Sequence, residues 1–346
     1  MAVYNDVEEG GRPVCVVVEW FDAQRMQTRE FLLKYYRAEQ QGEMYDLSAR
    51  RSFLKKSAVP VLPDLVVGTE FVLYSRSLKV KAYADDATRQ LYSEENAETR
   101  VAVAAAENFG DPLSAVEQKH TITALRLVQL NGTEAAELAA CVDSSSSSFE
   151  LYASEHKVLA LTFRGGPVSV RGVAFAQKGK EEELRHLLFE RPLAKWPFAT
   201  FGKNCALCVI KPHVLRDKRC GAVVKMIEAS FEVGALQLFK LERDQANEFL
   251  EVYDGVLSDY FDHVAALCLG PCLAVEIRGD ADVVARFRDA CGPWDVDFAR
   301  DLRPDSIRAK FGANNVDNAV HCTDLPDQGD SEARFFFQLL ATNGVS

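Results

Sequence analysis

Apolar and polar residues alternate over residues 14–83 in short runs that turn-forming residues separate. This period of two predicts antiparallel strands that turn one face toward a core. The predicted strands cover residues 16–21, 30–36, 43–47, 71–75 and 78–83. Residues 85–98 are rich in Asp, Glu, Ser and Asn, which favours a linker. We therefore expect a tail over residues 1–13 and a β-rich module with its linker over residues 14–98.

The pattern changes after residue 98, where short apolar strands alternate with helical stretches such as residues 133–140 and 281–291. This alternation is an α/β rhythm. Together with the β-rich module before it, the predicted fold class of the whole chain is α+β. The serine run over residues 144–148 predicts a low-complexity loop. Pro192, Trp196 and Pro197 mark a boundary between two further domains, over residues 99–196 and 201–342.

Two sets of identities suggest that these domains are copies of one unit. At an offset of 111, the matching pairs are Ala124/Ala235, Leu125/Leu236, Leu127/Leu238, Leu130/Leu241, Ala135/Ala246 and Glu137/Glu248. At an offset of 114, they are Leu159/Leu273, Ala160/Ala274, Arg164/Arg278 and Gly165/Gly279. Chance matching of small apolar residues is the alternative explanation.

Charge and apolar content limit the partners of the chain. The 346 residues carry 40 Lys and Arg against 51 Asp and Glu, a net charge of −11 that opposes generic binding to nucleic acid or anionic lipid. Residues 1–9 are acidic and lack the apolar core of a signal peptide. The longest apolar stretch, residues 264–275, is shorter than the ~20 residues that cross a bilayer. We expect a cytoplasmic protein with no membrane or nucleic-acid partner, whose nine cysteines are reduced.

Residues 314–324 hold the richest chemistry, centred on His321. A histidine that is neutral near pH 7 keeps one lone pair, which can attack phosphorus. Glu332 follows eleven residues later on a predicted helix, where its carboxylate can hydrogen-bond the second imidazole nitrogen and fix the tautomer. A single histidine is more often a packed or surface residue, so the combination carries the prediction.

Phosphoryl transfer also needs cations around the transferred group. Lys211 follows the apolar run over residues 205–210, at the end of a predicted strand where α/β sites open. Arg288 and Arg308 flank a proline-containing loop over residues 292–304. Taken alone, each of these side chains is more often a solvated surface charge.

Residues 204–340 resemble the nucleoside diphosphate kinases. The motifs that match are Ile210-Lys211-Pro212-His213, Ser306-Ile307-Arg308 and Asn318-Ala319-Val320-His321-Cys322-Thr323-Asp324. The resemblance implies a ferredoxin-like αβ sandwich and a ping-pong reaction, in which His321 takes the γ-phosphate of an NTP such as ATP and passes it to an NDP. It also implies that Mg²⁺ arrives with the bound nucleotide and that the protein itself holds no metal.

Carried over residue by residue, the resemblance assigns phosphate or ribose contacts to Lys211, Arg288, Arg308 and Asn318. It makes Tyr253 and Glu332 the residues that position His321, with Thr323 beside it. Cys322 replaces the usual glycine after the histidine, and Trp294 lies near a position that normally holds a small hydroxyl residue. The stretch from Tyr253 to Gly270 is also short, so no residue is assigned to stack on the base, and reduced activity is expected.

Residues 99–196 resemble a degenerate copy of the same family. Ala105 stands opposite Lys211, and Phe175 opposite His321. Gly165 and Phe175 are 10 positions apart, against 42 between Gly279 and His321, so the stretch that carries both arginines is missing. We expect this copy to pack rather than to catalyse.

The N-terminal module resembles the PH-like DM-ten module of axonemal proteins, over residues 18–22, 31–36, 42–46, 53–56 and 68–85. One such module before two kinase-like copies is the arrangement of the axonemal tandem nucleoside diphosphate kinases. The resemblance implies binding to tubulin of doublet microtubules and to other axonemal proteins. It places the chain in the cytoskeleton of a cilium or flagellum, with basal bodies or centrosomes as further sites.

Weaker signals leave alternatives open. The basic residues Arg50, Arg51, Lys55 and Lys56 suit either an acidic tubulin surface or a solvated turn. Cys205 and Cys208 have the spacing of half a zinc site, but a strand points them to opposite faces and favours core cysteines. The chain has no Walker-type glycine loop. The competing function is a purely structural microtubule component with a vestigial nucleotide site.

Overall fold

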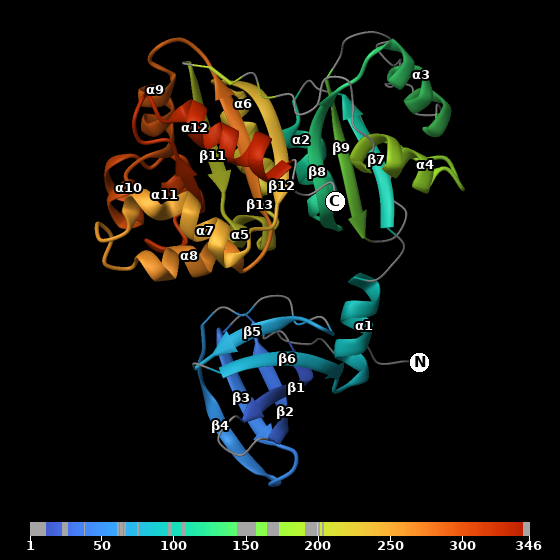
Figure 1. Ribbon diagram of the computed structural model, residues 1–346, viewed down its shortest axis with the longest axis vertical. Coiled ribbons are helices and arrows are strands. Elements are labelled where there is room, and N and C mark those ends of the chain that lie inside the picture. The colour runs from blue at the N-terminus through green and yellow to red at the C-terminus, as the bar shows by residue number, and fades with distance from the viewer. Residues whose placement is uncertain are drawn as a thin grey trace, which may run out of the picture. The chain divides into compact units, whose positions relative to one another are not determined.

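The computed structural model describes residues 12–341 apart from residues 23–26, 38, 61, 63–64, 66, 75, 96–98, 106–107, 144–156, 165–172, 191–198, 200 and 203. The chain folds into two compact units, residues 1–96 and residues 97–346 (Figure 1). Residues 1–11 of the predicted tail lie outside the described residues, as do the serine-rich loop, Pro192, Trp196 and Pro197. No helix in the part that is described is long and apolar enough to span a membrane.

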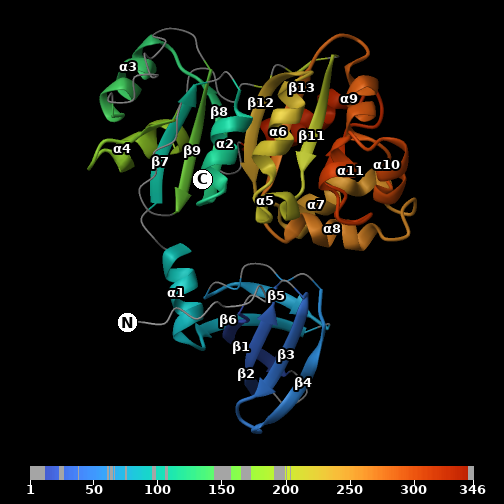
Figure 2. The same cartoon turned by 180° about the vertical axis from the view of Figure 1, so that it is seen from behind.

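The first unit is a six-stranded antiparallel sheet with one helix, visible in both views (Figures 1 and 2). The strand order is β4-β3-β2-β1-β6-β5. The elements are β1 (Val14–Asp22), β2 (Gln27–Tyr36), β3 (Gln41–Asp46), β4 (Arg51–Ala58), β5 (Glu70–Leu73), β6 (Arg76–Tyr83) and α1 (Asp86–Glu95). Alternate residues of β1 and β2, such as Val16, Val18, Phe31 and Leu33, form its core.

Helix α1 corrects the prediction of a linker over residues 85–98. Asp85 caps its start by accepting a hydrogen bond from the Thr88 amide at 2.6 Å. Tyr92 anchors the helix, because its ring is buried in the sheet core and its hydroxyl accepts from the Leu65 amide at 3.0 Å. One buried aromatic in a polar segment was too weak a signal for a sequence pattern.

Strand β4 was also missed, because none of its side chains is fully buried: Leu54 is partly buried against the core, and Phe53 is exposed although its ring packs on Phe31, with centroids 4.8 Å apart. Arg51, Lys55 and Lys56 therefore lie on an edge strand rather than in a turn. Charged side chains on an edge strand discourage pairing with other sheets.

The second unit contains one eight-stranded sheet, in the order β10-β7-β9-β8-β12-β13-β11-β14. Its first half comprises β7 (Thr99–Ala105), α2 (Gly110–Glu117), β8 (Thr121–Gln129), α3 (Gly132–Cys141), β9 (Lys157–Arg164), β10 (Val173–Phe175), α4 (Glu181–Arg185) and a π-helix, His186–Glu190. If the four strands of each half are numbered along the chain, they lie in the sheet in the order 2-3-1-4, which the first half shows in reverse. Every described pairing within the halves is antiparallel. This is the order of a ferredoxin-like sheet.

The second half has more helices than the first. It comprises β11 (Cys205–Ile210), α5 (Pro212–Arg216), α6 (Cys220–Glu228), β12 (Glu232–Phe239), α7 (Arg243–Leu250), a 3₁₀-helix (Glu251–Tyr253), α8 (Tyr260–Cys268), β13 (Cys272–Arg278), α9 (Val283–Cys291), α10 (Val296–Leu302), α11 (Ile307–Phe311), β14 (Val320–Cys322), α12 (Gly329–Arg334) and a π-helix, Phe335–Leu340. Apolar residues of α6 and α9 cover one face of the sheet, and those of α7, α8 and α12 cover the other.

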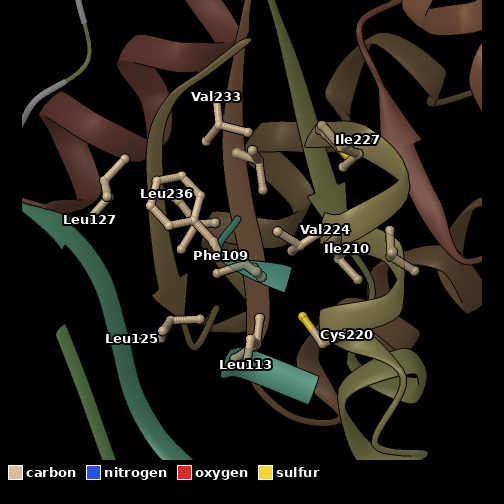
Figure 3. Packing of buried hydrophobic residues seen from close by; sticks show 14 of the residues in the cluster. Phe109, Leu113, Leu125, Leu127, Ile210, Cys220, Val224, Ile227, Val233 and Leu236 are labelled. Atoms are coloured by element: carbon tan, nitrogen blue, oxygen red, sulfur yellow. The ribbon is translucent and has the colours of Figure 1, made fainter. Parts of the chain in front are cut away.

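The halves meet where β8 pairs with β12 through Arg126 and Gln237, and where α2 packs against α6. Phe109, Leu113, Leu125 and Leu127 of the first half pack there with Val224, Ile227, Val233 and Leu236 of the second half (Figure 3). Arg126 and Gln237 are 111 positions apart, which is the repeat offset. Equivalent residues of the two copies therefore face each other across the seam.

Two glutamates make this relation reciprocal. Glu117 of α2 accepts hydrogen bonds from the Cys220 and Gly221 amides at 3.1 and 2.9 Å. Glu228 of α6 accepts from the Phe109 and Gly110 amides at 2.7 and 2.9 Å. Each helix thus caps the positive N-terminus of the other, and every equivalent pair is again 111 positions apart. The two copies are related by a pseudo-two-fold axis within one chain.

Candidate active site

His321 lies in β14, opposite Val209 of β11. Because side chains alternate along a strand, His321 faces the layer of α7, α8 and α12, whereas Cys322 enters the opposite core. The imidazole and the ring of Phe249 pack edge to face, with ring centroids 4.8 Å apart. Only 3% of its side chain is exposed.

Glu332 on α12 orients this imidazole. Its Oε1 lies 3.3 Å from His321 Nε2, the contact that the spacing predicts. Its Oε2 accepts a hydrogen bond from the Thr323 hydroxyl at 2.7 Å. A carboxylate at Nε2 favours the tautomer that carries the proton there and leaves the lone pair on Nδ1. That Nδ1 is buried and has no hydrogen-bond partner among the described residues.

Two cations lie in the interior near the histidine. Arg308 on α11 donates to the carbonyls of Gly292 and Val320 at 2.7 and 3.2 Å, which places it beside β14. Lys211 precedes α5 and donates to the Val316 carbonyl at 2.6 Å. Burial, with a further contribution from the charge of Arg308, lowers the pKa of Lys211 to about 7.

Arg288 and Tyr253 converge on Asp324, three residues after the histidine. Arg288 on α9 donates to the Asp324 carbonyl at 2.9 Å, and half of its side chain is exposed. The Tyr253 hydroxyl donates to the Asp324 carboxylate, and burial raises the pKa of that phenol. Tyr253 therefore contacts His321 through its ring, with centroids 6.2 Å apart, while its hydroxyl binds Asp324.

The remaining predicted residues lie close by. Asn318 is fully buried and donates through Nδ2 to the Trp294 carbonyl at 3.3 Å. Thr323 also accepts a hydrogen bond from the Leu207 amide at 2.7 Å. The structure thus brings together all eight residues that the sequence singled out, while the role of each stays a prediction.

Sequence reasoning assigned no role to Asp324 or to His263. Asp324 stood inside the quoted motif, so its position after the histidine was the available signal. His263 on α8 lies 3.4 Å from Lys211 Nζ through its Nδ1, and burial lowers the pKa of its imidazole. No spacing in the sequence linked it to Lys211.

Cys322, which follows the histidine, lies among thiols on the other face of β14. Its Sγ is 3.5 Å from an Arg308 guanidinium nitrogen. A hydrogen bond from Cys291, together with the charge of Arg308, holds the pKa of Cys322 below its usual range. All nine cysteines are free, including Cys205, which donates to the Gly202 carbonyl.

The register of the sheet corrects one prediction about the first copy. Val173 pairs with Ala104 and Ala174 with Val103, as Val320 pairs with Ile210 and His321 with Val209. Ala174 therefore occupies the place of His321, and the expected residue, Phe175, occupies that of Cys322. Matching four residues of sequence could not fix the register of a three-residue strand. In both alignments the first copy lacks the histidine.

These features define a duplicated ferredoxin-like αβ protein with one histidine-centred site. The sequence model of the nucleoside diphosphate kinase family matches residues 204–341. Mouse "Nucleoside diphosphate kinase homolog 7" is 34% identical over 94% of this chain and 92% of the relative, and the rat homolog gives the same three values. The chain belongs to the nucleoside diphosphate kinase family, with the predicted tandem arrangement.

Other members of the family match a smaller share of this chain. The nucleoside diphosphate kinase of Aquifex aeolicus is 32% identical over 38% of this chain and 92% of the relative. A crystal structure of the Aquifex enzyme aligns with 40% of this chain and 97% of that chain, at 30% identity and a TM-score of 0.38.

Proposed function

We propose that the second copy transfers the γ-phosphate of a nucleoside triphosphate to a nucleoside diphosphate through a phosphohistidine on His321. The observation that carries this proposal is the asymmetry of the imidazole: Nε2 faces Glu332 at 3.3 Å, and Nδ1 has no partner among the described residues. Buried polar atoms in proteins nearly always have a hydrogen-bond partner, so an unpartnered one needs an explanation. A nucleophilic nitrogen that bonds to the substrate phosphate provides that explanation.

In the first half-reaction, the Nδ1 lone pair of His321 forms a bond to the γ-phosphorus. The bond from that phosphorus to the bridging oxygen breaks, and its electron pair leaves with the diphosphate. The imidazole then carries a positive charge, which the Glu332 carboxylate stabilises through the Nε2 proton. In the second half-reaction, a β-phosphate oxygen of another diphosphate attacks phosphorus, and the electron pair of the P–N bond returns to Nδ1.

Positioning and charge stabilisation provide most of the catalysis in phosphoryl transfer, and three positively charged side chains lie at the proposed site. Lys211 and Arg308 lie in the interior, and Arg288 reaches the site from the surface. Arg308 Nε and Asn318 Oδ1 are also buried without a partner among the described residues. Mg²⁺ enters as part of the nucleotide substrate, in keeping with its habit of binding through phosphates.

The test is phosphorylation of the full chain by ATP labelled at the γ-phosphate. Wild-type protein should acquire a phosphate that acid releases and base does not. His321→Asn should lose at least 100-fold of the label, because the amide has no nucleophilic nitrogen. His186→Asn, at an exposed histidine of the first copy, should label like the wild type. Unlabelled wild-type protein would support the structural alternative, and full labelling of His321→Asn would reject this histidine as nucleophile.

We further propose that the first unit is a PH-like DM-ten module that attaches the chain to doublet microtubules of the axoneme. Its six-stranded sheet followed by a single helix suits such a module, and Arg51 and Lys55 present exposed side chains on its edge strand. An acidic microtubule surface would attract this edge by charge complementarity. The similarity to the two rodent homologs extends over 94% of the chain and therefore includes this unit.

A further inference from the structure

Trp294 lies among the cations of the proposed phosphate site. Lys211 Nζ is 5.6 Å and Arg308 Cζ 5.3 Å from the centroid of its ring. The rings of His263 and Tyr253 lie 5.2 and 5.9 Å away. The indole is therefore in contact with both buried cations and with the tyrosine that packs on His321.

This arrangement is closed to a nucleotide. An indole attracts cations through its π face but offers no oxygen acceptor. Lys211 and Arg308 donate instead to the carbonyls of Val316, Gly292 and Val320. Their other polar neighbours are His263 Nδ1 and Cys322 Sγ. His321 Nδ1 is itself buried. A phosphorus atom cannot reach that nitrogen, nor phosphate oxygens these cations, until something moves.

The backbone around Trp294 is held by hydrogen bonds from two buried side chains, so a change at this site falls to the side chain. The Gly292 carbonyl accepts from Arg308, and the Trp294 carbonyl accepts from Asn318. Gly292 has a φ of +83°, and a Cβ built there would lie 2.3 Å from Ser306 Oγ, which fits a tightly packed turn. Trp294 is only partly buried. A rotamer change can expose the cations without moving the loop.

We propose that Trp294 is the gate of this site: its indole occupies the space between Lys211 and Arg308 that the phosphates of a nucleoside di- or triphosphate require, and the nucleotide binds when the indole swings out. The inference rests on the proposed function and adds its regulation. If the open form makes up 1–10% of the population, closure weakens the apparent affinity about 10- to 100-fold.

The first test measures access to His321 without any nucleotide. Diethyl pyrocarbonate acylates an unprotonated imidazole nitrogen, and peptide mass spectrometry follows its reaction with His321. Trp294→Ser should raise the rate about tenfold or more, as expected when a mostly closed population becomes open. Trp294→Phe, which keeps an aromatic ring between the cations, should react at nearly the wild-type rate. Equal rates for wild type and Trp294→Ser would overturn the gate.

A second measurement does not depend on removing the indole. In a chain with Trp20→Phe and Trp196→Phe, Trp294 is the remaining tryptophan. Saturating Mg-ADP should shift its emission to the red as the ring moves into water, and an unchanged spectrum in a chain that binds Mg-ADP would contradict the gate. The two proposals fail separately. If Trp294→Ser opens His321 to the reagent and no variant takes label from ATP, the kinase function fails while the gate stands.

Discussion

The amino group of Lys211 lies in the interior, between the Val316 carbonyl and the imidazole of His263. Asp317 and Asp259 partly offset its burial, but the pKa of Lys211 still falls from 10.5 to about 7. In the unfolded chain this lysine binds its proton below about pH 10.4. In the folded chain it does so only near pH 7 and below. Between these values the unfolded state holds more protons, so the folded state loses stability as pH falls.

This lysine predicts a pH dependence of stability. The quantity to follow is the free energy of unfolding of the wild type minus that of Lys211→Met. We expect this difference to rise from pH 7 to pH 10, by up to about 1.4 kcal/mol per pH unit, and to be constant below pH 7. Urea unfolding at several pH values measures it. Lys225→Met, at a side chain that is 65% exposed, controls for the loss of one positive charge. A difference that stays flat from pH 7 to 10 would show that the buried amine keeps its proton.

Single residues of the site were predictable where a short motif carried them. The eleven-residue spacing placed Glu332 at His321, and the lone pair of a neutral imidazole suggested the nucleophile. The partner of the Tyr253 hydroxyl and the position of the Trp294 ring were not predictable. The first depends on how the 3₁₀-helix Glu251–Tyr253 packs against the segment after β14, and the second on the loop before α10. Sequence spacing does not encode that packing.

At the scale of elements, the contact between α2 and α6 depends on two glycines. A Cβ at Gly221 would lie 2.4 Å from the Ser114 amide nitrogen, and one at Gly110 would lie 2.6 Å from that of Lys225. These neighbours are backbone atoms, which cannot turn aside as a side chain can. The close approach also brings Glu117 and Glu228 within reach of the opposite helix N-terminus.

Gly221→Ala should therefore destabilise the second unit by about 1–3 kcal/mol, because α2 and α6 must separate to admit the methyl group. Hydrogen exchange of the backbone amides in α6 and β12 measures the change. The matched control is Gly132→Ala at the start of α3, where a Cβ meets nothing within 4 Å. Similar protection of these amides from exchange in wild type and Gly221→Ala would mean that the two helices can shift without loss of stability.

The elements themselves were predicted unevenly. Strands with clear alternation, such as β2 and β6, lay close to their expected bounds. Strand β4 and helix α1 were not predicted, because each offers little apolar surface to the core. The one-residue error at β10 arose because three residues carry no periodicity of their own. The order of strands needed the whole sheet, which no local pattern describes.

At the scale of the whole molecule, the repeat offset of 111 revealed the duplication but not its assembly. The sequence left open whether the two copies pair with each other. The structure answers this, because Arg126 and Gln237 join the copies into one sheet and the helix caps are reciprocal. Such pairing depends on side chains from both copies meeting, so it cannot be read from either copy alone.

The two compact units predict separable activities. Deleting residues 1–96 should abolish sedimentation with microtubules and leave labelling of His321 at the wild-type level, because residues 97–346 form a unit of their own. Co-sedimentation and labelling of the same preparation measure both. Arg51→Glu with Lys55→Glu should weaken sedimentation of the full chain, and Lys178→Glu, in the second unit, should not. Loss of both activities on deletion would contradict separate units.

Because each glutamate cap belongs to a different half of one polypeptide, the pairing survives any dilution and always has a ratio of one to one. A subunit encoded once and used twice would carry every substitution on both sides of its contact. Here the two sides are separate stretches of one chain and can differ, as Ala174 of the first copy differs from His321 of the second. Fusion in one chain thus allows the two copies to keep different functions while they stay paired.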